Sequence, residues 1–196
     1  TNGGALLNQG TLFLQGVEMI NNKAPTGGGG AINNVGQLTV SGSVVNGNTA
    51  KNSGGGLDNG TNANASIIDT LFTGNLAWSG GAISTGGTLT LTGSTLSNNA
   101  ADTATTPDSG YGGGIVWHGG SGNITIINST ITGNRASAGG GIFSSALENE
   151  RELIIISSTI TDNTSTITSH VQSCGAGIHT QGQIGRAHAR NPATSL

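Results

Sequence analysis

Two motifs that recur along the chain stand together in Phe72-Thr73-Gly74-Asn75-Leu76-Ala77-Trp78-Ser79-Gly80-Gly81-Ala82-Ile83. One motif is an apolar residue followed three positions later by Asn, and the other is a glycine-rich tetrad that ends in Leu or Ile. The tetrad recurs seven times along the 196 residues, and its ends lie 26, 25, 26, 32, 27 and 36 residues apart. These ends are Leu6, Ile32, Leu57, Ile83, Ile115, Ile142 and Ile178. Such a period indicates a solenoid of stacked repeats.

Between the tetrads, apolar and polar residues alternate, which is the pattern of a strand with one buried face. Aligned on the Asn motif, the six copies give two apolar columns: Leu12, Leu38, Ala65, Leu89, Ile124 and Leu153, and then Leu14, Val40, Ile67, Leu91, Ile126 and Ile155. Each repeat is therefore predicted to contain three short strands: the end of the tetrad, the alternating segment and the residues before Asn. A unit this small cannot bury its apolar side alone, so neighbouring repeats must stack with their strands parallel.

We predict an all-β, single-stranded parallel β-helix of six to seven rungs. The coil is expected to be right-handed, because parallel crossover connections overwhelmingly have that hand. The glycine run is expected to form one corner, since glycine adopts φ > 0 without a side-chain penalty.

The recurrent Asn side chains are predicted to point inward and to hydrogen-bond with their copies along the rod. This asparagine ladder comprises Asn22, Asn48, Asn75, Asn99, Asn134 and Asn163. A second, shorter ladder is expected two positions after the tetrad's apolar end, at Asn8, Asn34 and Asn59.

Composition and charge exclude several classes of protein. Gly supplies 36 residues, and charged residues are only 8% of the chain, which excludes a helical bundle. Six Lys and Arg residues cannot form the basic patch that nucleic-acid binding requires. No apolar run approaches the roughly 20 residues needed to span a bilayer. The single Cys, Cys174, excludes an internal disulfide and a Cys-based metal site, and we predict neither a metal nor a cofactor.

The tetrads Gly29-Gly30-Ala31-Ile32 and Gly80-Gly81-Ala82-Ile83, with Phe72-Thr73-Gly74-Asn75, resemble the GGA[ILV] and FxxN repeats of the chlamydial polymorphic outer membrane protein family. Looser copies extend over residues 3–178, and most have an aliphatic residue in place of Phe. The resemblance implies a secreted or cell-surface bacterial protein, usually a passenger or adhesin and part of a larger chain. These motifs specify a fold more strongly than a function.

Two insertions follow ladder Asn residues at the same predicted corner, Ala100–Tyr111 in the fourth repeat and Thr164–Cys174 in the sixth. The fifth repeat turns tightly between them, so the insertions are expected to project side by side and to flank a shallow groove. The predicted groove residues are Asp102, Asp108, Arg135 and His170. The alternative is that these residues are solvated loop charges around one surface arginine.

Trp117 and His118 lie where the second ladder would place Asn and a turn residue. Trp117 is interpreted either as a cap on the interior or as an exposed platform for a sugar ring, and the second interpretation applies to Trp78 as well. Trp117 and His118 complete the predicted binding residues, and no catalytic residue is predicted.

The favoured function is a non-catalytic, exported or cell-surface module that binds a glycan or another host-surface ligand. The alternative is a carbohydrate-active lyase or hydrolase, because pectate lyases and polygalacturonases share the predicted fold. Those enzymes need clustered carboxylates on neighbouring rungs, whereas Asp58 and Asp69 are scattered singly. A third hypothesis is an ice- or crystal-binding face, because Thr39, Ser66, Thr90 and Thr125 form part of a hydroxyl column.

Residues 1–182 are predicted to form one β-helix domain of a longer protein. The repeat stops at about Gln183, so residues 183–196 are expected to be an irregular tail that is foreign to the native chain. Unpaired strand edges at the ends of the coil predict either that the natural protein is longer or that the chain associates end to end.

Overall fold

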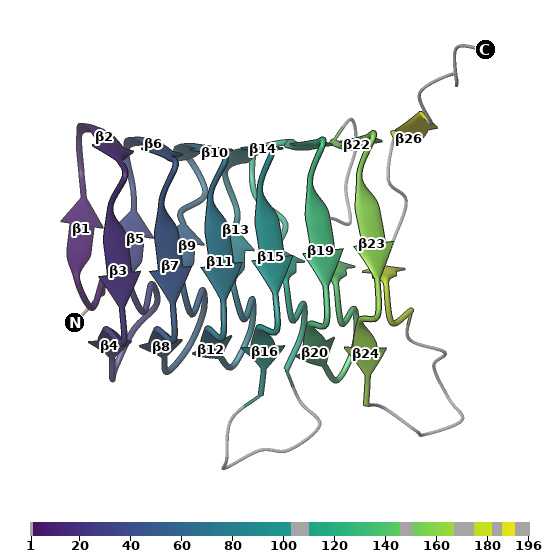
Figure 1. The fold of residues 1–196 in the computed structure, drawn as a ribbon, viewed down its shortest axis with the longest axis horizontal. Helices are drawn as coiled ribbons and strands as arrows, with labels where there is room; N and C mark the ends of the chain where they lie inside the picture. Colours follow the sequence, from purple (N-terminus) through teal and green to yellow (C-terminus); the bar gives the residue numbers. More distant parts are fainter. Residues whose placement is uncertain (1, 103–109, 146–150, 167–174, 182–185, 191–196) are drawn as a thin grey trace.

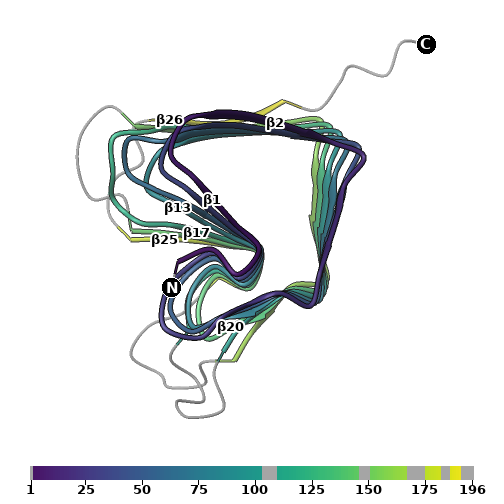
Figure 2. The same cartoon turned by 90° about the vertical axis from the view of Figure 1, so that its left-hand side faces the viewer.

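The chain coils into a parallel β-helix in which every regular element of the described residues is a β-strand (Figure 1). The computed structural model describes residues 2–102, 110–145, 151–166, 175–181 and 186–190. Viewed from the N-terminal end, the chain turns clockwise as it recedes, so the coil is right-handed (Figure 2). The predicted fold class is therefore confirmed.

Four parallel sheets run along the rod, and each strand pairs with its copy in the next coil. Sheet A contains β1 (Leu6–Asn8), β5 (Ile32–Asn34), β9 (Leu57–Asn59), β13 (Ile83–Thr85), β17 (Ile115–Trp117), β21 (Ile142–Ser144) and β25 (Ile178–Thr180). Sheet B contains β2 (Thr11–Gln15), β6 (Gln37–Ser41), β10 (Asn64–Ile68), β14 (Thr88–Thr92), β18 (Ile124–Ile127), β22 (Glu152–Ile156) and β26 (Arg186–Arg190).

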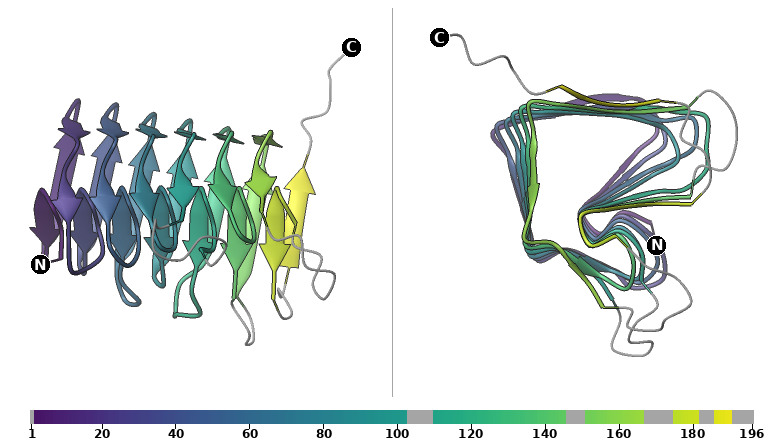
Figure 3. Two further views of the ribbon diagram at one scale, coloured as in Figure 1. Left: turned by 90° about the horizontal axis from the view of Figure 1, so that it is seen from below. Right: turned by 90° about the vertical axis from the view of Figure 1, so that its right-hand side faces the viewer.

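Sheets C and D complete each coil. Sheet C contains β3 (Glu18–Ile20), β7 (Val44–Asn46), β11 (Leu71–Thr73), β15 (Thr95–Ser97), β19 (Thr130–Thr132) and β23 (Thr159–Thr161). Sheet D contains β4 (Lys23–Ala24), β8 (Thr49–Ala50), β12 (Leu76–Ala77), β16 (Ala100–Ala101), β20 (Arg135–Ala136) and β24 (Thr164–Ser165). The coils superpose when the rod is viewed along its axis from the opposite end (Figure 3).

Sheets A, B and C each contain one of the three strands that the sequence predicts in every repeat, whereas sheet D is not predicted. Its two-residue strands follow the ladder Asn and bond to the preceding coil, as the Thr49 amide does to the Asn22 carbonyl at 2.9 Å. The segment 183–196, predicted to be irregular, contains β26, which pairs with β22. The domain boundary near residue 182 stays a prediction.

The core lies between sheets A, B and C. Leu89 and Ile124 of sheet B are fully buried and in register, and they pack in one cluster with Ile83 of sheet A and Leu96 of sheet C. Burying each such side chain contributes about 1.5–3 kcal/mol. Because each coil contributes only a few of these residues, the core depends on stacking several coils.

The asparagine ladder is confirmed. Nδ2 of Asn48 donates to Oδ1 of Asn75 at 3.0 Å and to the carbonyl oxygen of Met19 at 2.8 Å. Oδ1 of Asn48 accepts from both Nδ2 and the backbone N–H of Asn22, each at 2.9 Å. The same four-bond pattern surrounds Asn75, Asn99 and Asn134. Each of these buried amides is therefore fully hydrogen-bonded.

The second ladder is also confirmed at Asn8, Asn34 and Asn59. Nδ2 of Asn8 donates to Oδ1 of Asn34 at 2.7 Å, and Nδ2 of Asn34 donates to Oδ1 of Asn59 at 2.8 Å. The row ends at Thr85, whose Oγ1 accepts from Asn59 at 3.0 Å. The next residue in this column is Trp117.

The cross-section folds inward between sheets A and D, and the second glycine of the tetrad makes this possible (Figure 2). A Cβ on Gly30 would lie 2.7 Å from the backbone of Thr49 in β8 of the same coil, and it would overlap the carbonyl oxygen of Gly55. Gly29, directly before, has φ of 69°, in the region that disfavours side chains. Glycine at these two positions lets each coil close against its own strand of sheet D.

We expect Gly30→Ala to destabilise the fold by about 3 kcal/mol or more, because the added methyl group meets backbone on two sides. The matched control is Gly10→Ala, since a Cβ there has nothing within 4 Å, and its effect should stay within about 0.5 kcal/mol. Urea unfolding followed by circular dichroism measures both. Equal midpoints for the two variants would contradict the proposed role of the tetrad.

Replacing Asn75 with Ala is expected to cost about 3 kcal/mol or more. The change leaves the buried amide and backbone N–H of Asn48 without their acceptor, and each such group costs about 1–3 kcal/mol. Asn46→Ala, at an outward-facing position of β7, is the control and should be nearly neutral. Thermal unfolding of the two variants separates ladder hydrogen bonding from the general loss of an Asn side chain.

Candidate functional site

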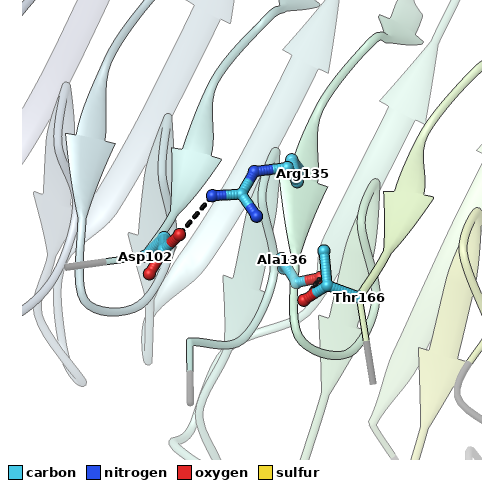
Figure 4. Close-up of polar contacts among 4 residues, drawn as sticks. All are labelled: Asp102, Arg135, Ala136 and Thr166. Carbon is cyan, nitrogen blue, oxygen red and sulfur yellow. Dashed lines mark hydrogen bonds and ion pairs between the residues drawn. The ribbon is translucent and has the colours of Figure 1, made fainter. Parts of the chain in front are cut away.

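The predicted groove residues that the structure describes, Asp102 and Arg135, meet on neighbouring coils at the corner of sheet D. Nη2 of Arg135, at the start of β20, donates to Oδ2 of Asp102, directly after β16 (Figure 4). The side chain of Arg135 is 48% exposed and that of Asp102 is 21% exposed. Asp108 and His170 lie outside the described residues.

Trp78 joins this corner because sheet D aligns it with Asp102. Leu76 pairs with Ala100, so Trp78 and Asp102 occupy equivalent positions two residues further along adjacent coils. Lys51 holds the same position one coil earlier. Trp78 is 40% exposed and lies edge-on to Tyr111, with ring centroids 6.4 Å apart.

The corner therefore presents an aromatic surface beside an ion pair. We define the corner site by Trp78, Asp102 and Arg135. An aromatic face can stack on the apolar face of a sugar ring, while the carboxylate accepts and the guanidinium donates hydrogen bonds to hydroxyl groups. The second carboxylate oxygen of Asp102, Oδ1, is buried and has no hydrogen-bond partner among the described residues.

A row of aromatic rings extends from the corner site along the inward fold between sheets A and D. Tyr111 lies 4.6 Å from Phe143, and Phe143 stacks on His179 at 5.2 Å. Phe143 is only 3% exposed and packs with Val116. Tyr111 is therefore packed against the Phe143 cluster and also contacts the exposed Trp78 ring edge-on.

Trp117 and His118 do not belong to the corner site. Trp117 is fully buried in the core, so the expectation that it binds a ligand at the surface is wrong. Its indole is in the second ladder column, opposite Thr85. His118 is exposed beyond the end of β17, at a different corner of the coil, and partial desolvation lowers the pKa of its imidazole.

Asp58 is the partly buried acid on the outer side of sheet A. Its Oδ2 accepts hydrogen bonds from Oγ of Ser53 at 3.1 Å and from Nδ2 of Asn33 at 3.3 Å. Burial raises the pKa of the Asp58 carboxyl, and hydrogen bonds from Ser53 and Ser84 oppose the rise without cancelling it. The sequence places Asp58 correctly as an isolated acid, since its neighbours in register are Asn33 and Ser84.

The hydroxyl column noted in the sequence lies on the outer face of sheet B. Thr39, Ser66, Thr90 and Thr125 are in register on sheet B. Phe13 and Ile154 interrupt this column at its two ends.

Within the described ranges, no three His, Cys, Asp or Glu side chains gather in a geometry that would hold a metal ion. The same residues contain no helix long and apolar enough to span a membrane.

Residues 69–86 match the Chlamydia polymorphic membrane protein (Chlamydia_PMP) repeat. The matched segment runs from β11 through the ladder residue Asn75 and the tetrad to β13, so it contains both motifs that shape the coil. The chain is a surface β-helix repeat protein that resembles the Chlamydia polymorphic membrane proteins. This resemblance agrees with a location at the cell surface. Searches of curated protein sequences and of solved structures gave no match.

The raised pKa of Asp58 predicts how stability depends on pH. The folded protein holds the Asp58 proton more tightly than the unfolded chain, so the free energy of unfolding should fall as pH rises from about 3.8, the ordinary Asp value, through the raised pKa. Asp58→Asn should remove this decrease and make the protein more stable than the wild type at neutral pH. Urea midpoints measured between acid and neutral pH test this, and identical pH profiles would contradict it.

Proposed function

We propose that this chain is a non-catalytic segment of a surface-exposed β-helix protein and that its corner site binds a glycan. The observation that carries the proposal is the exposed Trp78 beside the Asp102–Arg135 ion pair on a rigid stack of strands. The match of residues 69–86 to the Chlamydia polymorphic membrane protein repeat supports the surface location.

The ion pair suits a ligand site better than a role in folding. Exposed salt bridges contribute only about 0–1 kcal/mol to stability, because water screens them and ordering two long side chains has an entropic cost. The same two groups can form charge-assisted hydrogen bonds with ligand hydroxyls, which are roughly twice as strong as neutral ones. Trp78 adds a rigid, partly exposed surface for stacking at little further entropic cost.

A panel of immobilised glycans, scored for both binding and cleavage, tests the proposal. We expect the wild-type protein to bind without cleaving, and Trp78→Ala to weaken binding about tenfold or more. Ile20→Ala removes an apolar side chain of similar exposure, 43%, from sheet C and should leave binding unchanged. Arg135→Gln should weaken binding with little effect on the unfolding midpoint.

Two results would contradict the proposal. One is the absence of glycan binding by the folded wild-type protein. The other is glycan cleavage that Asp102→Ala abolishes without unfolding the chain, which would favour a carbohydrate-active lyase or hydrolase.

A further inference from the structure

A shallow trough of about 180 Å³ lies on the outer face of sheet B, on a different side of the coil from the corner site. It crosses β2, β6, β10 and β14, so its long direction follows the axis of the rod. Its polar walls include Gln37, Thr39, Asn64, Ser66, Thr88 and Thr90. At about 4.8 Å between neighbouring strands, four strands span about 14 Å.

Strand register builds the trough. Gln37, Asn64 and Thr88 form one outward column, and Thr39, Ser66 and Thr90 form a second, two residues further along the same strands. The inward residues between the columns, Leu38, Ala65 and Leu89, point into the core. The backbone of the strands forms the floor of the trough, and the side chains of the two columns form its walls. These side chains repeat at the spacing of the strands.

Amides and hydroxyls, which both donate and accept hydrogen bonds, provide the polar chemistry of the trough. Nδ2 of Asn64 donates to Oε1 of Gln37 at 3.0 Å, which orients both side chains on the trough wall. No Lys, Arg, Asp or Glu is among the described residues that line it. A charged ligand would lose hydration in the trough and find no opposite charge there to compensate. An uncharged ligand rich in hydroxyls also loses hydration, but it regains hydrogen bonds with the amides and hydroxyls of the walls.

We propose that this trough binds an uncharged polysaccharide chain lying along the axis of the rod. A polysaccharide is itself a linear repeat of hydroxyl groups, so successive sugars meet the same amide and hydroxyl pattern on successive strands. At one end, Phe13 is 61% exposed and in register with Thr39, and it offers a ring against which a terminal sugar packs. The inference extends the proposed function, since the ligand is again a glycan, but it uses different residues.

The test compares one blocked trough with one matched control. β-1,4-linked hexamers of glucose and of N-acetylglucosamine are the neutral probes, and polygalacturonate is the charged probe. Ser66→Tyr fills the trough and should weaken binding of a neutral hexamer about tenfold or more. Ser97→Tyr places the same side chain at an outward position of β15 in sheet C and should leave binding unchanged. Added salt should have little effect, because no ion pair is involved.

Asn64→Ala is a second variant that removes a wall side chain without adding bulk, and it should weaken binding in the same direction. Unchanged binding of the neutral hexamers by folded Ser66→Tyr and Asn64→Ala overturns the proposal, as does binding of polygalacturonate alone. If Trp78→Ala abolishes binding of the neutral hexamers while Ser66→Tyr has no effect, the trough proposal is contradicted and the corner site is supported. The reverse result supports the trough and contradicts the corner site.

Discussion

Each coil stacks on the next in register, because the buried ladder amides and the apolar columns both require it. A buried ladder amide such as that of Asn75 is satisfied only when Asn48 and Asn99 lie directly on either side of it. A shift of one residue in any strand would turn its apolar side chains outward and leave buried amides unpaired. Ladder and core thus enforce the same register, and that register aligns every outward column, including those of the corner site and the trough.

The features predicted correctly from the sequence are those that repeat. The columns through Leu38 and Leu89, and both ladders, recur in most coils, so alignment of the copies was enough to place them. Sheet D was missed because its strands contain only two residues, too few to show an alternating pattern. A signal was nevertheless present: the second residue after the ladder Asn is a buried alanine in five coils, namely Ala24, Ala50, Ala77, Ala101 and Ala136.

Missing sheet D also limited the prediction of the site. The sequence predicts that Asp102 and Arg135 share one corner, because both follow a ladder Asn, and their ion pair shows that they do. The sequence does not place Trp78 at this corner, because its position beside Asp102 depends on the pairing of β12 with β16. Trp117 shows the opposite case: its column is that of inward Asn8 and Asn34, which already favoured a buried indole over an exposed one.

A stack of this kind separates the residues that specify the fold from those that meet a ligand. Inward positions are restricted by neighbours above and below, as with Ile83 between Leu57 and Ile115. Outward positions such as those of Ser66 and Trp78 lie outside the core cluster, so their residues can differ from coil to coil without disturbing the core. The corner site illustrates this freedom: Trp78 stands where the neighbouring coils have Lys51 and Asp102, and the fold does not require an aromatic residue there.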